Sequence, residues 1–262
     1  MSDVVAKRNH RTWPAITIRG LCKTFGADPL YSNFDLDIPR NKIVTVFGPN
    51  GCGKSTLINM ISGQTPYERG EILFDGKTLK DTTIGYVFQN YRDALFPWKR
   101  AIDNIRYPLS LAGMRRAEVD SRVEKIVAAF DVKFDLNRYP YELSGGQQQL
   151  VSIMRALVPE PEVLFLDEPF SALDYEMTLF IREKLQQVFI ERGTTMMLVS
   201  HDIEEAIFLA DVVLLLTKRP TQIAEVIPFE VARPRTISTL STPDFVTTKA
   251  HTLEVFQREV NR

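Results

Sequence analysis

The segment GPNGCGKST, residues 48–56, restricts the possible folds of this chain more than any other feature. It fits the pattern G-x-x-x-x-G-K-[ST] and lies between a continuous apolar run, 43–47, and a predicted helix. Glycines allow backbone N–H groups to turn toward phosphate oxygens, and the positive end of the helix points at them. We expect Lys54 to reach the β- and γ-phosphates and Ser55 to offer its hydroxyl to Mg²⁺. The alternative is a chance match in a glycine-containing turn.

Two further segments place polar groups beside predicted elements. The apolar run 163–166 predicts a buried strand, and Asp167 and Glu168 follow at its end. One carboxylate there can hold Mg²⁺ and its neighbour can polarise an attacking water, although solvated acids also end ordinary strands. The segment LSGGQ at 143–147 precedes a helical pattern, and its N–H groups could bind an anion. Taken alone, the segment would be interpreted as a capped helix.

Strand-like and helical segments alternate along most of the chain. Short β-like runs are expected at 16–18, 36–38, 43–47, 70–74, 84–88, 163–166, 195–199 and 212–216. Helical periodicity replaces them between about 90 and 160, for example in the apolar positions of 119–130. The alternation favours a mainly parallel sheet, and the helical stretch favours a separate lobe attached to it.

The motifs occur in an order that resembles a known family. GPNGCGKST, LSGGQ, VLFLDEP at 163–169, SALD at 171–174 and SHD at 200–202 resemble the motif series of the ATP-binding-cassette (ABC) ATPases. The resemblance extends from about residue 16 to about residue 218. It implies an α/β fold with a RecA-like phosphate-loop ATPase core, a helical subdomain and a small antiparallel β region. It also implies hydrolysis of ATP with Mg²⁺.

The resemblance assigns roles to individual residues. It gives Glu168 as the catalytic base, His201 as the γ-phosphate switch and Lys54 as a catalytic lysine. Contacts with ATP are implied for Phe25, Gly48, Pro49, Asn50, Gly51, Cys52, Gly53, Lys54, Ser55, Thr56 and Gln89. Oxygen ligands of Mg²⁺ are implied for Ser55, Gln89 and Asp167. In a head-to-tail dimer the second cassette would contribute Ser144, Gly145, Gly146, Gln147 and Asp174.

Several of these residues have a plainer interpretation. Phe25 could be a core residue, Gln89 an ordinary loop amide and His201 a structural histidine. Cys52 lies in the segment 48–56, here called the phosphate loop, and is expected to fill space and not to act as a redox nucleophile. The chain also departs from the family pattern away from the nucleotide, at Asn41, Leu150, Met154 and Val212.

Composition restricts the class of protein further. The 262 residues, 44% of them hydrophobic, can bury the core of one large or two small domains. With 32 Lys+Arg, 33 Asp+Glu and a net charge of −1, no nucleic-acid partner is expected. Two cysteines exclude a disulfide framework and suit a reducing compartment. No membrane-spanning run and no secretory signal is found, so a cytosolic location is expected.

A single cassette with the segment DEPFSALD resembles a bacterial importer subunit. The segments DALFPW at 93–98, HDIEEAIFLAD at 201–211 and KRPTQI at 218–223 resemble the nitrate, sulfonate and taurine importer branch, which also includes bicarbonate systems. The implied partners are a second cassette, identical or related, integral-membrane permease subunits, and a periplasmic or lipid-anchored solute-binding protein. The implied location is the cytoplasmic face of the inner membrane. The alternative is an ABC ATPase outside import, acting in envelope lipid trafficking or in a soluble non-transport machine.

An apolar cluster follows Gln89. Leu95, Phe96 and Trp98 are either core residues or a docking site, and the family resemblance places this loop where a permease helix is received. We predict permease coupling for these three residues.

Three regions of the chain are expected. Residues 1–14 form a flexible N-terminus, 15–218 the ATPase domain, and 219–262 a tail. The tail is expected to end in a helix capped at 242–243, with Phe245, Val246, Leu253, Phe256 and Val260 on one stripe. This stripe is expected to pack on the chain's own cassette or on its partner's. The alternative is a disordered end.

Overall fold

The computed structural model describes residues 15–171 and 173–261, so the predicted flexible segment 1–14 lies outside the described residues. The strands are β1 (Ile16–Phe25), β2 (Asp28–Ile38), β3 (Ile43–Phe47), β4 (Arg69–Phe74), β5 (Ile84–Val87), β6 (Val163–Asp167), β7 (Thr195–Val199), β8 (Val212–Leu216) and β9 (Ile223–Pro228). The helices are α1 (Lys54–Ile61), α2 (Tyr91–Ala94), α3 (Ala101–Leu111), α4 (Arg116–Ala129), α5 (Gly145–Leu157), α6 (Tyr175–Arg192), α7 (Ile203–Leu209) and α8 (Pro243–Val260).

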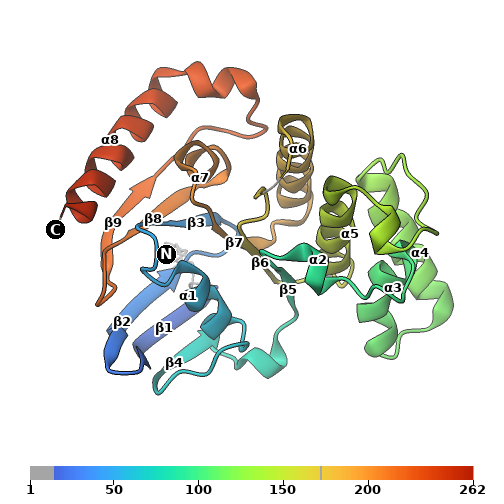
Figure 1. The fold of residues 1–262 in the computed structure, drawn as a ribbon, viewed down its shortest axis with the longest axis horizontal. Helices are drawn as coiled ribbons and strands as arrows, with labels where there is room; N and C mark the ends of the chain where they lie inside the picture. The colour runs from blue at the N-terminus through green and yellow to red at the C-terminus, as the bar shows by residue number, and fades with distance from the viewer. Residues whose placement is uncertain (1–14, 172, 262) are drawn as a thin grey trace, which may run out of the picture.

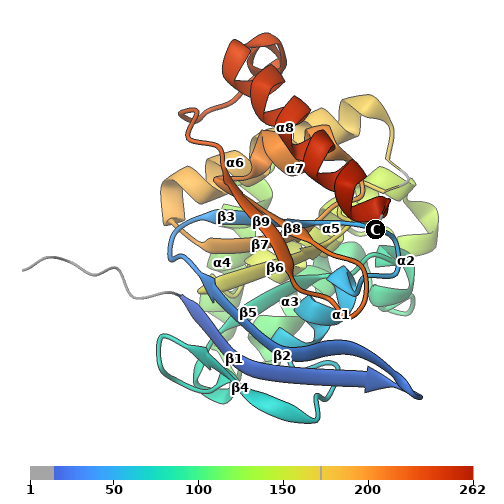
Figure 2. The same cartoon turned by 90° about the vertical axis from the view of Figure 1, so that its left-hand side faces the viewer.

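Two sheets form the body of the molecule (Figure 1). The larger has the order β5-β6-β7-β3-β8-β9, in which every neighbouring pair is parallel except β8 with β9. The smaller is antiparallel, with the order β2-β1-β4. Helix α1 lies between the two sheets, and α6, α7 and α8 cover the opposite face of the larger one (Figures 1 and 2).

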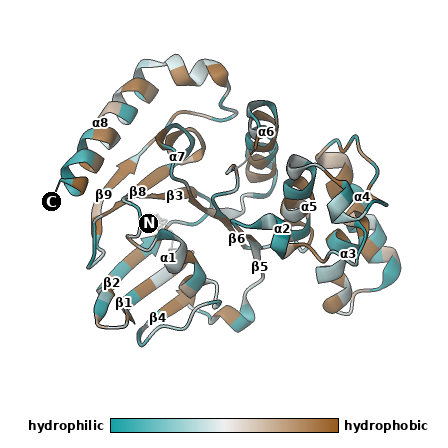
Figure 3. Ribbon diagram, in the orientation of Figure 1, coloured by the Kyte–Doolittle hydropathy of each residue, from teal (hydrophilic) through white to brown (hydrophobic). Residues whose placement is uncertain are grey.

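Alternation along the parallel strands produces two hydrophobic cores. In β3, Val44 and Val46 pack in the core shared with α1 and the antiparallel sheet, whereas Ile43 and Phe47 pack in the core shared with the covering helices. All five residues of β3 are buried, as a strand covered on both faces requires. The strands in the middle of the molecule are accordingly coloured as hydrophobic in Figure 3.

The helices α2 to α5 form a lobe at the β5 edge of the large sheet (Figure 1). Its attachment depends on a very close approach at Gly85 of β5. A Cβ atom on Gly85 would lie 2.4 Å from the carbonyl oxygen of Ala156, near the end of α5. Only glycine therefore allows α5 to lie directly over the edge strand.

The tail extends the sheet beyond the strands expected from the sequence. Strand β9 pairs with β8, and the sequence analysis did not identify it.

A buried arginine, Arg235, attaches the tail to α7. Its guanidinium donates to the carbonyl oxygens of Phe208 (3.0 Å) and Ala210 (2.6 Å) at the end of that helix. The tail is thereby fastened to the helix that follows His201. Desolvation by burial lowers the pKa of Arg235 to about 10, and the guanidinium remains charged at neutral pH.

Helix α8 begins as predicted, and only part of its predicted stripe, Phe245 and Phe256, packs on this chain. The Thr242 side chain accepts a hydrogen bond from the Phe245 N–H, and Pro243 occupies the first turn. The buried residues of α8 are Phe245, Thr252, Val255 and Glu259. Val246, Leu253 and Val260 are 54%, 41% and 39% exposed, so within this chain they do not pack on the cassette, and packing on a partner's cassette stays a prediction for them.

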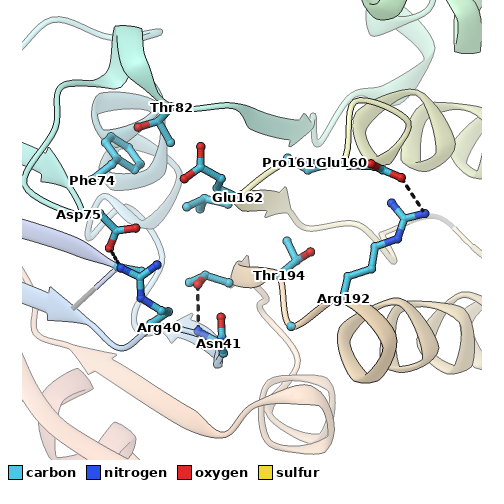
Figure 4. A pocket seen from close by; sticks show the side chains of 14 residues that line it. Arg40, Asn41, Phe74, Asp75, Thr82, Glu160, Pro161, Glu162, Arg192 and Thr194 are labelled. Carbon is cyan, nitrogen blue, oxygen red and sulfur yellow. Dashed lines mark hydrogen bonds and ion pairs between the residues drawn. The ribbon is translucent and has the colours of Figure 1, made fainter. Parts of the chain in front are cut away.

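A cavity of about 490 Å³ lies at the amino ends of the parallel strands (Figure 4). Arg40 pairs with Asp75 on one side of it, and Arg192 pairs with Glu160 at 3.9 Å on the other. This is the edge of the sheet opposite to residues 48–56. Within the described part of the chain, no helix is long and apolar enough to span a membrane.

Candidate nucleotide site

The carboxyl ends of the parallel strands bring the predicted site residues together. Gly48 directly follows β3, Gln89 is the second residue after β5, and Glu168 directly follows β6. His201 stands shortly after β7. Because parallel strands end at the same edge of a sheet, segments far apart in the sequence meet there.

The phosphate loop is shaped by backbone that requires glycine. Gly48 has φ +156°, and a Cβ there would lie 2.9 Å from the carbonyl oxygen of Leu216. Gly53 has φ +99°, and its Cβ would lie 2.9 Å from Leu30. The buried ammonium of Lys54 donates to the carbonyl oxygens of Gly48 (2.9 Å) and Pro49 (3.1 Å). The lysine is thus held inside the loop at the N-terminus of α1, where an anion would be stabilised.

Ser55 and Asp167 form the part of the site that fits a divalent cation. The Ser55 hydroxyl donates to a carboxylate oxygen of Asp167 at 2.8 Å. Asp167 is only 5% exposed, and desolvation raises the pKa of its carboxyl above the ordinary value, with the Ser55 hydrogen bond opposing the shift. A buried carboxylate beside a hydroxyl offers the hard oxygen ligands that Mg²⁺ prefers, and a cation would remove the cost of its charge.

Glu168 is held by two polar side chains from neighbouring strand ends. Its Oε2 accepts a hydrogen bond from the Gln89 amide at 3.1 Å and lies 3.2 Å from Nδ1 of His201. Its backbone has φ +45°, the left-handed region that a glutamate rarely adopts. The surrounding structure maintains this conformation, with the Glu168 N–H donating to Val199 and the Ser171 hydroxyl donating to the Glu168 carbonyl. Gln89 and His201 are therefore partners of the glutamate in this structure.

The residues expected to contact ATP bound to a second cassette lie away from the cluster around Glu168. Ser144 caps α5, accepting from the Gln147 N–H at 3.3 Å while its own N–H donates to the Gln147 side chain at 3.0 Å. Asp174 caps α6 by accepting from the Met177 N–H at 2.8 Å. Helix α5 lies in the helical lobe, on the far side of β5 and β6 from α1 (Figure 1). Gly145 and Gly146 follow Ser144 in the first turn of α5.

Two residues near the phosphate loop differ in their exposure to solvent. Phe25, at the end of β1, is 48% exposed and is not a core residue, so its ring is available to a ligand. Cys52 is 1% exposed, and burial raises the pKa of its thiol. A buried, protonated thiol is a poor nucleophile, in agreement with a space-filling role.

The cluster after Gln89 divides into core and surface. Leu95 is 2% exposed and belongs to the core, so the prediction that it couples to a permease is wrong for this residue. Phe96 is half-buried and packs edge-to-face on Tyr107, whereas Trp98 is 71% exposed. Sequence analysis missed Asn104, whose buried amide accepts from the Phe96 N–H (2.9 Å) and donates to the Lys99 carbonyl (3.1 Å). It fixes the loop that carries Trp98.

Comparison with known proteins identifies the family. The ABC transporter family matches residues 31–171. The chain is 36% identical over 258 residues to the taurine import ATP-binding protein TauB of Escherichia coli K12, covering 93% of this chain and 98% of that protein. The chain belongs to the ATP-binding subunits of ABC transporters. It is also 32% identical over 264 residues to an uncharacterised ABC transporter ATP-binding protein of Methanocaldococcus jannaschii, covering 98% and 97% of the two chains.

Solved structures agree with this assignment. A dimeric ATP-binding cassette in a post-hydrolysis state, bound to ADP and Pi, superposes with a TM-score of 0.73 at 27% identity. The match covers 83% of this chain and 100% of that one. The predicted ABC fold is confirmed, and this ABC subunit is an ATPase that uses ATP with Mg²⁺.

The departures of this ABC subunit from the family pattern affect packing. Leu150 and Met154 of α5 are 3% and 0% exposed and join the core that links the lobe to the sheet. Asn41 stands in a turn with φ +53°, a left-handed conformation that asparagine tolerates better than most residues.

Proposed function

We propose that this ABC subunit hydrolyses ATP to energise a bacterial importer of a small solute that carries an anionic group, such as taurine or another sulfonate, nitrate or bicarbonate. The observation that carries the proposal is the 36% identity to a taurine import subunit over nearly the whole of both chains. A role outside import is not favoured. Under this proposal the subunit is peripheral to the cytoplasmic face of the inner membrane and serves a permease and a solute-binding protein.

In the proposed mechanism, each polar group at the strand ends has one task. Lys54 places its charge on the β- and γ-phosphates, and the N–H groups of the loop bind phosphate oxygens. Mg²⁺, when bound with ATP, neutralises phosphate charge, and Ser55, Gln89 and Asp167 would supply its protein oxygen ligands. Glu168 orients the attacking water as general base, and His201 contacts the γ-phosphate. Phe25 would stack on the adenine.

We further propose that a second cassette completes the site. Ser144, Gly145, Gly146, Gln147 and Asp174 would contact ATP held by the partner's phosphate loop. The N-terminus of α5 supports this role, since its first N–H groups lack partners within the helix and favour an anion. Hydrolysis would remove the γ-phosphate contacts that hold the two copies together, so the dimer would open.

The groove beside Trp98 is the proposed permease site. A cavity of about 360 Å³ there is lined by Phe88, Phe96, Tyr107 and Leu111, among others. Arg155 donates to the Ala94 carbonyl at 2.7 Å and, with Asn104, holds the loop at the rim of this groove. A preformed apolar groove with an exposed aromatic anchor suits a short helix of a membrane subunit.

Glu168→Gln tests the catalytic assignment. We expect this variant to bind ATP normally but to lose turnover, because the amide keeps the shape of the side chain and lacks the base. It should accumulate as a dimer with ATP, which light scattering would detect as a doubled mass. Lys54→Ala is the comparison, since it should lose nucleotide binding itself. Parental ATPase activity in Glu168→Gln would show that the base lies elsewhere.

Uptake measurements test the importer. Disrupting the gene should abolish uptake of one labelled solute among taurine, nitrate and bicarbonate. The parent gene should restore uptake and the Glu168→Gln gene should not. Unchanged uptake of all three solutes would contradict the proposed substrate class.

A further inference from the structure

Three consecutive carbonyl groups of the phosphate loop are each held by a side chain from outside the loop. The Arg219 guanidinium donates through Nε to the carbonyl of Gly51 at 2.8 Å. The Thr221 hydroxyl donates to the carbonyl of Cys52 at 2.6 Å, and the Tyr31 hydroxyl to the carbonyl of Gly53 at 3.0 Å. Sequence analysis assigned no role to these three donors.

The donors come from two segments that lie side by side. Tyr31 belongs to β2, and Thr221 lies in the connection between β8 and β9. The two residues form an isolated parallel bridge, and the Thr221 N–H donates to the carbonyl of Leu30 at 2.7 Å. Tyr31 is 1% exposed and Thr221 is fully buried. Two of the three donors are therefore fixed by the core and cannot exchange with water.

The geometry of the peptide bond determines the effect on the loop. A trans peptide unit is planar, so its carbonyl and its N–H point in opposite directions. Holding the carbonyl of Cys52 fixes the direction of the Gly53 N–H. The carbonyl of Gly53, which accepts from the Leu57 N–H of α1 at 2.8 Å as well as from Tyr31, fixes the direction of the Lys54 N–H. Holding the carbonyl of Gly51 likewise fixes the Cys52 N–H, which donates to the Pro49 carbonyl at 3.3 Å and closes the turn.

Glycine makes such restraint necessary. Gly51 and Gly53 have φ +74° and +99°, values that glycine adopts readily. The same freedom lets glycine adopt many other conformations, so ordering the loop costs a large conformational entropy. External donors reduce that freedom before any ligand arrives, which lowers the cost of ordering the loop on binding.

We propose that Tyr31, Arg219 and Thr221 are positioning residues for nucleotide binding. They hold three carbonyls of the phosphate loop outward, so that the N–H groups of Gly53 and Lys54 face the phosphates and the turn closed by the Cys52 N–H keeps its shape. This role rests on the proposed assignment of the phosphate loop, residues 48–56, as a nucleotide-binding loop. It requires no contact between the three residues and the nucleotide.

Thr221→Val and Tyr31→Phe test the inference, because each removes one hydroxyl and keeps the shape of the side chain. Each should weaken ADP binding, followed by fluorescence titration, on the order of fivefold. The KM for ATP should rise in parallel, whereas kcat at saturating ATP should stay within about twofold, because Glu168 is untouched. Thr221→Ser, which keeps the hydroxyl, should restore the parental affinity.

Thr252→Val is the matched control. Thr252 is also fully buried, and its hydroxyl donates to a backbone carbonyl, that of Thr248 in α8, at 2.7 Å. The two valine variants should lose similar stability in a thermal melt, but only Thr221→Val should lose ADP affinity. Equal loss of affinity in both variants, or none in Tyr31→Phe and Thr221→Val, would overturn the inference.

Two further measurements complete the test. If Thr221→Val does not fold, Tyr31→Phe decides the outcome alone, and parental ADP affinity in it overturns the inference. Lys54→Ala separates the two proposals: if it keeps parental ADP affinity, the nucleotide-loop assignment itself has failed. If Lys54→Ala loses affinity and the hydroxyl variants do not, only the positioning role has failed.

Discussion

At the scale of single residues, the two acids that end β6 occupy states that a stable fold alone would not select. Asp167 is a buried carboxyl whose pKa is raised by desolvation, so its ionised form is disfavoured in the folded protein. Glu168 has left-handed backbone, with φ +45°. Such costs are characteristic of functional sites, where the surrounding structure enforces a conformation that the chemistry needs.

Asp167→Asn should therefore stabilise the nucleotide-free subunit while removing its Mg²⁺ dependence. The amide can still accept the Ser55 hydrogen bond but carries no charge. We expect the melting temperature at neutral pH to rise by about 2–4 °C, equivalent to about 1 kcal/mol in a domain of this size. Calorimetry without nucleotide, and ADP titration with and without Mg²⁺, provide the measurements.

The pH dependence of this difference has a definite sign. A carboxyl whose pKa is raised on folding destabilises the fold when the pH exceeds its ordinary value. The stability gap between Asp167→Asn and the parent should thus be largest at neutral pH and should close as the pH falls and Asp167 is protonated. A gap that is absent at neutral pH would show that the buried charge costs nothing.

At the scale of elements, α8 shows what periodicity alone leaves open. Two stripes with helical spacing run along it, one through Phe245 and Val255 and the other through Val246, Leu253 and Val260. The first is buried although it also contains Thr252 and Glu259. Phe245 packs edge-to-face on Phe229, next to Arg235, and this contact determines which stripe faces inward.

Alanine substitutions distinguish the two stripes. Phe245→Ala should lower the free energy of unfolding by about 3–5 kcal/mol, because it empties a fully packed position. Val246→Ala should change it by no more than about 0.5 kcal/mol, because this side chain is 54% exposed. Urea titration measures both. Similar losses in the two variants would mean that the outer stripe is also covered in solution.

The site was more predictable from sequence than the elements around it. Lys54, Asp167 and Glu168 could be predicted as site residues because each belongs to a short motif of neighbouring residues at a strand end. Thr221 and Asn104 were missed because their roles depend on backbone carbonyls that the sequence does not display, in the case of Thr221 169 residues away. Strand β9 was missed because Glu225 and Pro228 weaken its strand pattern.

At the scale of the whole molecule, neighbouring residues of the loop after β5 have different roles: one stabilises the fold and another is exposed to a partner. Leu95 lies in the core and Trp98 lies on the surface, three residues apart. A large exposed aromatic, held in place by Asn104 and flanked by an apolar groove, is typical of an interface that a partner covers.

Trp98→Ala should leave folding and ATP binding intact but release the subunit from its permease. Loss of such an anchor costs on the order of 2 kcal/mol, or about thirtyfold in affinity. Co-purification with membranes measures this, beside a thermal melt. Ile190→Ala, which removes a 53% exposed side chain on α6, is the control and should keep the complex. Leu95→Ala should lower stability instead, and undiminished membrane recovery of Trp98→Ala would place the permease elsewhere.

The separation of Lys54 from Ser144 within one chain has a consequence for rates. If each ATP is cleaved only between two copies, then in dilute solution the rate rises with the square of the subunit concentration, and specific activity falls on dilution. A membrane complex that holds two copies side by side removes this dependence. The permease would then act as a concentrating scaffold, and the subunit's hydrolysis would be confined largely to the place where transport occurs.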